Sequence, residues 1–332
     1  MVKYKGTVHT VSLSFNHLTR PEVWTIVLGI LINSLILMAI LMGIGYYLRS
    51  RKILNDEGEI TLTFMLVNIT TPAMVINAMN IEFSLEQLKT GGILIAVAVA
   101  FDILLIFLNK IASFKMKDEE KVKMIKYSVV LLNGGFMGFP LAYQLYGSQG
   151  MFYATMFHVP NIIFMWTYGV SLLLGKSKLE NRYKSMLLNP GMIGVYIGLL
   201  LYFSQIKLPL FADSLLELLT NATTFLSMII IGSKIATIGV RDSLIDKEAY
   251  AASFFRLAAS PVLMIIILKF FDFDIMIEQI YVMYASLPVA TLMPILAQRY
   301  GGDVIFGSKI VVITHLISLF TIPFFFWLYT VI

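Results

Sequence analysis

The sequence predicts an all-α integral membrane protein of ten transmembrane helices, arranged as two inverted repeats of five, with the fourth and ninth helices broken. Three observations predict this fold. Hydrophobic residues fill 58% of the 332 positions and charged residues only 14%, whereas soluble domains carry about 25% charged residues. Basic residues gather in alternate loops between the apolar runs. Two proline-containing motifs recur at a separation of 154 residues.

Apolar runs define the spans. The predicted spans of the first half are 24–48, 60–80, 89–112, 124–147 and 150–174, and those of the second half are 190–206, 212–239, 247–271, 278–300 and 304–331. Most reach the roughly 20 residues that cross about 30 Å of hydrocarbon, and the sixth is short by that measure. We therefore expect repeats at 24–175 and 190–332, joined by a linker at 176–189. Residues 1–23 are polar and lack the apolar core of a signal peptide.

Loop charge predicts the orientation. Lysine and arginine cluster after the first span (Arg49, Arg51, Lys52), after the third span and in the linker. The positive-inside rule places these loops in the cytoplasm, and both chain termini outside. Because five spans are an odd number, the second half begins on the opposite side, so the halves are inverted. This distribution also accounts for the net charge of +5, and no nucleic-acid partner is expected. The predicted location is the plasma membrane, with several passes.

The repeated motifs run from Pro140 to Gly147 and from Pro294 to Gly301, with Gln, Tyr and Gly at equal offsets from each proline. A second echo, Asn68-Ile-Thr-Thr and Asn221-Ala-Thr-Thr, recurs at an offset of 153 residues. Two echoes at nearly one offset favour an internal repeat.

The fourth and ninth spans contain residues that interrupt a helix. The fourth has three glycines and a proline within eight residues, and each glycine costs about 1 kcal/mol relative to alanine; the ninth has two prolines. Unwound backbone in a membrane is tolerated where it is buried in protein or lines a cavity, and half-helix N-termini suit an anion. The alternative is a pair of simple proline kinks. The predicted substrate-binding residues are Asn133, Gly134, Gly135, Gly138, Pro140, Pro288, Thr291 and Pro294.

The runs 133–147 and 286–303, together with Asn189-Pro190, resemble the auxin efflux carrier family over nearly the whole chain from Trp24. The short linker is similar to that of prokaryotic members. The resemblance implies the fold of the bile-acid/sodium symporters, in which spans 4 and 9 cross at their breaks and hold the substrate. It also implies a scaffold of spans 1, 2, 6 and 7 and a moving transport domain of spans 3–5 and 8–10.

Ionisable and amide side chains inside the spans are further candidates. Asp102 and Arg256 are 154 residues apart, deep in spans 3 and 8, and we expect them to pair. Such a pair is either structural or couples transport to a substrate or proton, and Arg256 is alternatively a receptor for a carboxylate. His158 and His315 are candidates for proton coupling, or else hydrogen-bonded packing residues. Gln144 and Gln298 would contact a ligand or cation, or satisfy backbone groups freed by the prolines.

Other functional classes fit poorly. The chain has no cysteine, its four histidines do not form an HExxH pair, and it has no Walker A motif. We expect no enzyme activity, metal site or cofactor. The predicted function is secondary transport of a small organic anion, a malate-like or auxin-like carboxylate, by elevator-type alternating access. A channel and a sodium-coupled symporter remain the alternatives. The expected partners are the anion and the lipid bilayer, with a homodimer left open.

Overall fold

The computed structural model describes residues 20–332 except 115, 175–187, 189, 240–242 and 245. The predicted N-terminal segment up to residue 19, and the predicted linker except Leu188, lie outside the described residues.

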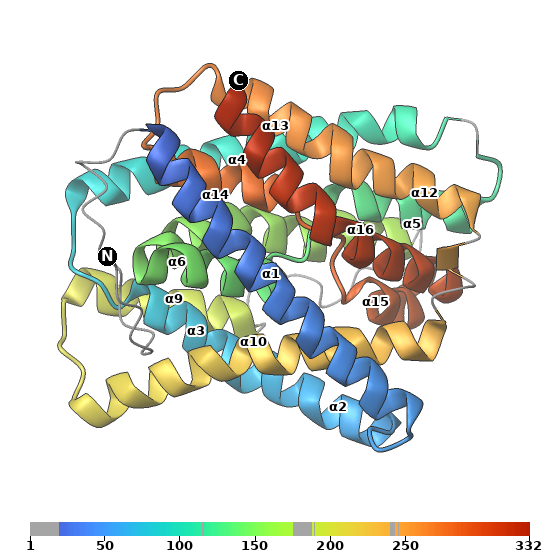
Figure 1. Ribbon diagram of the computed structural model, residues 1–332, viewed down its shortest axis with the longest axis horizontal. Coiled ribbons are helices and arrows are strands. Elements are labelled where there is room, and N and C mark those ends of the chain that lie inside the picture. Colours follow the sequence, from blue (N-terminus) through green and yellow to red (C-terminus); the bar gives the residue numbers. More distant parts are fainter. Residues whose placement is uncertain (1–19, 115, 175–187, 189, 240–242, 245) are drawn as a thin grey trace.

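Within this part of the chain every regular element is a helix, which confirms the all-helical prediction (Figure 1). The helices of the first half are α1 (Arg20–Ser50), α2 (Asp56–Met65), α3 (Thr71–Met79), α4 (Leu85–Ala112), α5 (Glu119–Val130), α6 (Phe139–Phe164) and α7 (Val170–Leu174). Those of the second half are α9 (Pro190–Ser204), α10 (Leu210–Ile238), α12 (Lys247–Phe254), α13 (Ser260–Leu268), α14 (Ile275–Ala285), α15 (Met293–Tyr300) and α16 (Val304–Val331).

Seven helices of the described chain are long and apolar enough to cross a membrane. The predicted sixth span is only the 15-residue α9, and the predicted ninth span is divided between α14 and α15. The fourth and fifth spans are joined through α6, which turns sharply at Gly147, where φ is +60°. The first helix begins at Arg20, four residues before the predicted span at 24. The count of ten spans stays a prediction.

Prolines account for the irregular turns within several spans. Five-residue π-helical turns end two residues before Pro72, Pro140 and Pro261. A proline ring clashes with the carbonyl one turn earlier, and a wider turn relieves that clash. The equivalent of Pro72 in the second half is Phe225, and α10 continues there as a regular helix. The two Asn-x-Thr-Thr motifs therefore differ in backbone conformation.

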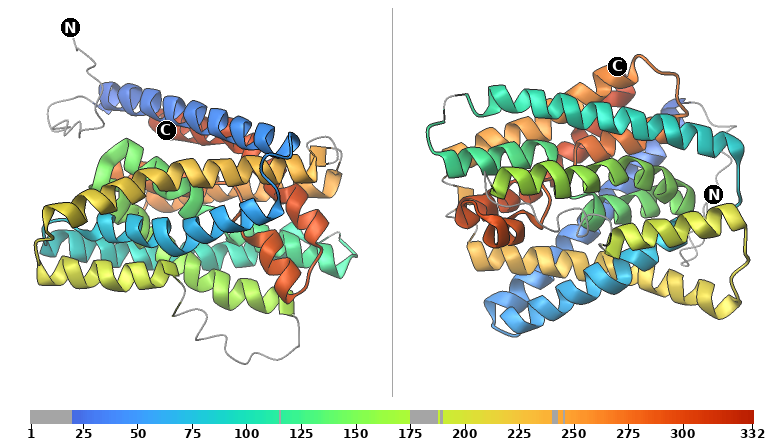
Figure 2. Two further views of the ribbon diagram at one scale, coloured as in Figure 1. Left: turned by 90° about the horizontal axis from the view of Figure 1, so that it is seen from below. Right: turned by 180° about the vertical axis from the view of Figure 1, so that it is seen from behind.

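Helix α1 lies along one face of the bundle and packs against α10 (Figure 2, left). Two glycines permit this approach. A Cβ atom on Gly45 would lie 2.2 Å from the carbonyl oxygen of Ile229, and one on Gly232 would lie 2.0 Å from that of Met42. Both obstacles are backbone atoms, which cannot rotate away as a side chain can. The two helices are thus held at a separation that only glycine allows.

Alanine at either close-contact glycine is expected to destabilise the protein. Gly45→Ala or Gly232→Ala should cost about 1–3 kcal/mol, because the added methyl group forces α1 and α10 apart. Gly29→Ala and Gly43→Ala are matched controls on α1, since a Cβ there has no neighbour within 4 Å. Thermal unfolding in detergent measures the difference. Equal melting temperatures for all four variants would contradict this account of the contact.

The start of α1 and the end of α16 lie at the same end of the bundle. Thr25 and Leu28 line one cavity together with the chain from Trp327 to Ile332. At another place, the start of α5 meets the start of α12 through an ion pair between Lys121 and Glu248. The prediction that both termini are external stays a prediction.

Candidate functional site

The two predicted breaks are present, and they lie side by side. Helix α5 ends at Val130 and α14 ends at Ala285, and each is followed by a non-helical segment. The segments pair as a short antiparallel bridge between Leu132 and Val289. The backbone N–H of Asn133 donates to the Pro288 carbonyl at 2.8 Å, and that of Ala290 donates to the Leu131 carbonyl at 3.0 Å. We call residues 131–134 and 286–292 the crossover.

Asn133 is at the centre of the polar contacts in the crossover. Its side-chain amide nitrogen lies 2.8 Å from Thr291 Oγ1 and 2.9 Å from His315 Nε2. All three residues are buried, with at most 4% of each exposed. The crossover therefore gathers an amide, a hydroxyl and an imidazole from three separate segments.

The hydrogen-bond partners of His315 determine its neutral tautomer. Nδ1 lies 2.8 Å from the Val311 carbonyl, which accepts and does not donate, so Nδ1 carries the proton. Nε2 is then the acceptor for the amide of Asn133. Both donors of that amide are engaged, by Thr291 and by His315. A ligand that competes for these donors would have to displace one of these two contacts.

Arg256 joins the ends of the two broken helices. It lies in the π-helical turn Phe255–Ala259 and is fully buried. Nη1 donates to the Val129 carbonyl at 3.0 Å, in the last turn of α5, and Nη2 donates to the Ala285 carbonyl, at the end of α14, at 2.6 Å. Ser260 also bonds to Nη2 and to the Ala285 carbonyl. Interrupting a helix leaves its last carbonyls without partners, and a cation is favourable at that negative end.

Asp102 and Arg256 interact electrostatically, but they do not form the expected ion pair at contact distance. No ion pair of the described residues includes either side chain. Asp102 Oδ1 instead accepts from the Asn161 amide at 3.3 Å, and Oδ2 has no hydrogen-bond partner. Arg256 bonds to carbonyls because the breaks supply two helix ends, which sequence spacing alone does not reveal. Both terminal nitrogens are in use while Nε has no hydrogen-bond partner, and a role for Arg256 as a receptor for a carboxylate stays a prediction.

The other predicted substrate-binding residues lie in or next to the crossover and differ in how far they are buried. Gly134 and Gly138 approach aromatic rings: a Cβ on Gly134 would lie 2.3 Å from His158 Nδ1, and one on Gly138 would lie 2.7 Å from Tyr284 Cζ. Gly135 is half-buried. Pro140 is buried in the first turn of α6, whereas Pro294, in the first turn of α15, is half-buried.

The remaining candidates do not join the Asn133 contacts. His158 packs edge-on against Phe139, with ring centroids 5.0 Å apart, and its Nδ1 has no hydrogen-bond partner. Gln144 is half-buried and Gln298 is exposed, each four residues beyond the proline that begins its helix. Neither glutamine forms one of the hydrogen bonds of the crossover.

Comparison with known proteins identifies the family. The sequence profile of the membrane transport protein family matches residues 30–326. The chain belongs to this family. It is also 25% identical over 303 residues to an uncharacterized transporter of Methanocaldococcus jannaschii, covering 88% of this chain and 97% of that protein. An uncharacterized transporter of Methanothermobacter thermautotrophicus is 24% identical over 292 residues, covering 86% and 93%. The resemblance to auxin efflux carriers is confirmed, and the protein is a membrane transporter.

In this transport protein the sequence analysis missed Asn161. Its amide nitrogen donates to the Val130 carbonyl at 3.1 Å as well as to Asp102, and its oxygen accepts from the backbone of Leu132 at 3.4 Å. Asn161 thus satisfies a carbonyl at the end of α5 and an N–H inside the first break. Thr314 likewise accepts from the backbone of Val289, at 3.4 Å, in the second segment. The repeat offset could have identified Asn161 as a candidate, because it lies 154 residues before His315, which was one.

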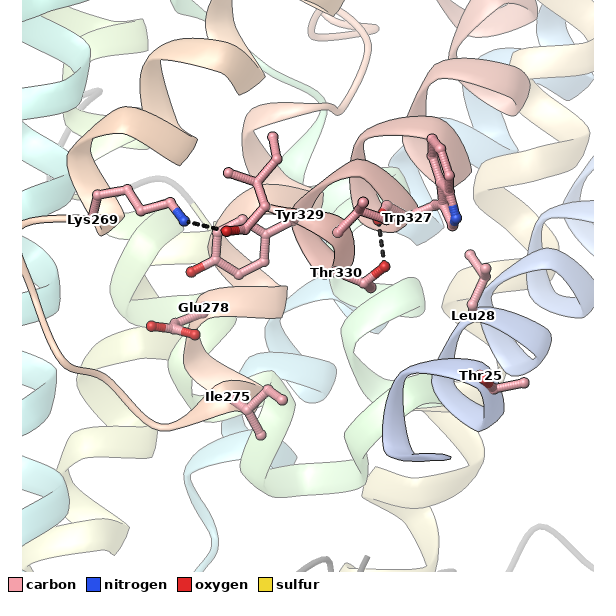
Figure 3. A pocket seen from close by; sticks show the side chains of 10 residues that line it. Thr25, Leu28, Lys269, Ile275, Glu278, Trp327, Tyr329 and Thr330 are labelled. Atoms are coloured by element: carbon pink, nitrogen blue, oxygen red, sulfur yellow. Dashed lines mark hydrogen bonds between the residues drawn. The ribbon is translucent and has the colours of Figure 1, made fainter. Parts of the chain in front are cut away.

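Two cavities on the transporter lie outside the crossover. One of about 520 Å³ is bordered by Lys269, Glu278, Trp327 and Thr330 (Figure 3). Lys269 donates to the Ile332 carbonyl there at 3.0 Å. The other, of about 710 Å³, lies between the end of α4 and the start of α12. None of the residues that line either cavity is one of the predicted site residues.

Proposed function

We propose that this protein is a secondary transporter that moves a small organic anion, such as a carboxylate, and binds it at the crossover. The observation that carries the proposal is the antiparallel pair of helix breaks with the Asn133 amide at its centre. Membrane transporters commonly bind substrate at paired discontinuous helices related by an inverted repeat.

The chemistry of the crossover suits an anion. The η3 turn (Gly134–Gly138) and α15 begin next to the paired segments, and the first N–H groups of a helix have no intrahelical acceptor. The positive ends of two helix dipoles are thus next to the amide of Asn133 and the hydroxyl of Thr291. The surrounding residues carry no carboxylate in contact with Asn133, Thr291 or His315 among the described residues.

The proposed motion is of the elevator type. Spans 3–5 and 8–10 would move as one body against a scaffold of spans 1, 2, 6 and 7, the division that the family resemblance implies. Two features support it: α1 packs on α10 and α3 on α9, which joins the scaffold helices across the repeats, and Arg256 ties α5 to α14 inside the moving body. Because Arg256 bonds to both half-helices, the crossover would travel as a unit.

Substitution of Asn133 tests the proposed site. Asn133→Ala is expected to lower kcat/KM for the transported anion roughly 10- to 100-fold, because a hydrogen bond to a charged group contributes about 1.5–3 kcal/mol. Asn68→Ala is the matched control, since Asn68 is exposed on its helix and bonds only to the Phe64 carbonyl. Uptake of a radiolabelled dicarboxylate panel into proteoliposomes, normalised to inserted protein, gives the comparison. Unchanged kinetics in Asn133→Ala would remove this residue from the site.

The same proteoliposomes separate the alternatives of a channel and a sodium-coupled symporter. A carrier saturates and shows counterflow, in which excess unlabelled substrate inside accelerates entry of label, and an open pore shows neither. Imposed sodium and proton gradients then distinguish the coupling ion. Linear, non-saturating flux without counterflow would favour the channel.

A further inference from the structure

The second cavity has features of a lipid site rather than of a substrate site. It is a groove of about 710 Å³ between the end of α4, the chain that follows it, and the start of α12. Lys110 and Lys247 border it on opposite sides, together with Ile111, Phe114 and Ala251. The groove therefore combines two ammonium groups with an apolar lining.

The two lysines are available to an anion. Both are exposed, and neither belongs to an ion pair of the described residues. Lys110 lies over the ring of Phe107, with Nζ 5.5 Å from the ring centroid. The one acidic residue of the lining, Glu248, is neutralised by its ion pair with Lys121. The charge that remains at the groove is positive.

An apolar stripe leads from the groove along the surface of α4. Ile103, Phe107 and Ile111 follow helical spacing on α4, and Phe114 lies two residues beyond its end. Their exposed fractions rise from 41% through 57% and 66% to 83% towards the groove. At 1.5 Å per residue the eight helical steps from Ile103 to Ile111 cover roughly 12 Å. That length is close to one leaflet of a bilayer whose hydrocarbon core is about 30 Å thick. An acyl chain would thus lie along the stripe while its headgroup reaches the lysines.

The predicted orientation places the groove at the cytoplasmic surface. The chain after α4 carries Lys115, Lys117, Lys121, Lys123 and Lys126, and the positive-inside rule assigns such loops to the cytoplasm. Anionic lipids give that leaflet a negative surface, which attracts nearby lysines. The positive charge of the groove, its apolar lining and its predicted place at the cytoplasmic surface all fit an anionic lipid.

From these observations we infer that the groove between α4 and α12 binds an anionic phospholipid of the inner leaflet, with the phosphate between Lys110 and Lys247 and an acyl chain along Phe107 and Ile111. The lipid would bridge α4 of the first half to α12 of the second, next to the Lys121–Glu248 ion pair. This site is separate from the crossover and does not depend on the transported substrate.

Native mass spectrometry of the purified protein tests the inference, with phosphatidylglycerol and phosphatidylcholine as probes. We expect one tightly bound phosphatidylglycerol that phosphatidylcholine does not replace. The double variant Lys110→Gln/Lys247→Gln should bind it roughly 30-fold more weakly, since two lysine contacts contribute about 2 kcal/mol. Lys89→Gln/Lys207→Gln is the control, because it removes two exposed lysines elsewhere.

Two further measurements make the result decisive. Ala251→Trp fills the groove without changing its charge and should also displace the lipid, and glycerol phosphate without acyl chains should not bind. Equal retention of phosphatidylglycerol by the wild type, the Lys110→Gln/Lys247→Gln variant and Ala251→Trp would overturn the inference. So would equal binding of phosphatidylcholine, because the headgroup charge would then play no part.

Discussion

Replacing Arg256 with glutamine is expected to destabilise the protein more than any other single change at the crossover. Glutamine cannot reach the Val129 and Ala285 carbonyls together, so at least one buried helix end loses its donor. Each unsatisfied buried group costs about 1–3 kcal/mol, and we expect a total loss of about 2–5 kcal/mol. The melting temperature in detergent should fall by roughly 5–15 °C. Transport should fall with it, because the two broken helices are no longer held together.

Arg299→Gln is the matched control for this variant. Arg299 is exposed in the last turn of α15, with its guanidinium 5.4 Å from the centroid of the Tyr300 ring, so its loss should cost no more than about 1 kcal/mol. Arg256→Lys should recover only part of the lost stability, since one ammonium group lacks the fork of a guanidinium. A melting temperature for Arg256→Gln equal to that of Arg299→Gln would sink the proposed clamp.

A double variant distinguishes the carbonyl contacts from an ion pair. If Arg256 served mainly to neutralise Asp102, then Asp102→Asn/Arg256→Gln would be more stable than Arg256→Gln alone. The structure predicts only a partial rescue, because the two charges interact but the carbonyls remain without donors in both variants. Full rescue of the melting temperature by Asp102→Asn would contradict this assignment.

Alanine at Gly134 is expected to abolish most transport activity. The new Cβ atom would lie 2.3 Å from His158 Nδ1 and 2.8 Å from Leu132 Cδ1. The imidazole has little room to retreat, since it packs edge-on against Phe139 and lies near Tyr284. The crossover next to Asn133 must then shift, at an overpacking cost of about 1–3 kcal/mol. We expect at least a tenfold loss of transport rate in proteoliposomes.

Gly135→Ala is the control one residue along the chain. Its Cβ would lie 3.6 Å from His158 Nε2, an ordinary contact distance, and transport should stay within about twofold of the wild type. Removing the obstacle in Gly134→Ala/His158→Ala should restore part of the lost activity if the clash with the imidazole is the cause. Equal defects in Gly134→Ala and Gly135→Ala would instead point to a general loss of glycine flexibility.

The sequence predicted the broken segments because glycine and proline act locally. Pro140 and the glycines before it disfavour a regular α-helix, and between α5 and α6 the chain is non-helical at 131–133 and then forms the π-helical turn Gly134–Gly138. The polar centre was also predictable in part, since Asn133, Thr291 and His315 were all candidates. Their contact was not predictable, because it depends on how three segments far apart in the sequence pack together.

Asp102 and Arg256 show where reasoning from spacing fails. Their separation of 154 residues places them at equivalent positions of the two halves, and equivalence in a repeat does not require contact. Arg256 found better partners in the carbonyls of α5 and α14, and Asp102 found Asn161. A buried guanidinium bonds to the acceptors that lie nearest to it in the folded protein, not to the residue at the equivalent position of the repeat.

The sequence by itself determined the membrane environment, the helical class and the location of the two helix breaks, because apolar length and the stereochemistry of proline and glycine act within a few residues. Only the tertiary structure decided which groups satisfy the backbone at those breaks: Asn161 at the first, and Arg256 across both. Without water, a buried carbonyl needs a hydrogen-bond donor from the protein. Tertiary packing decides which helix places such a donor within about 3 Å.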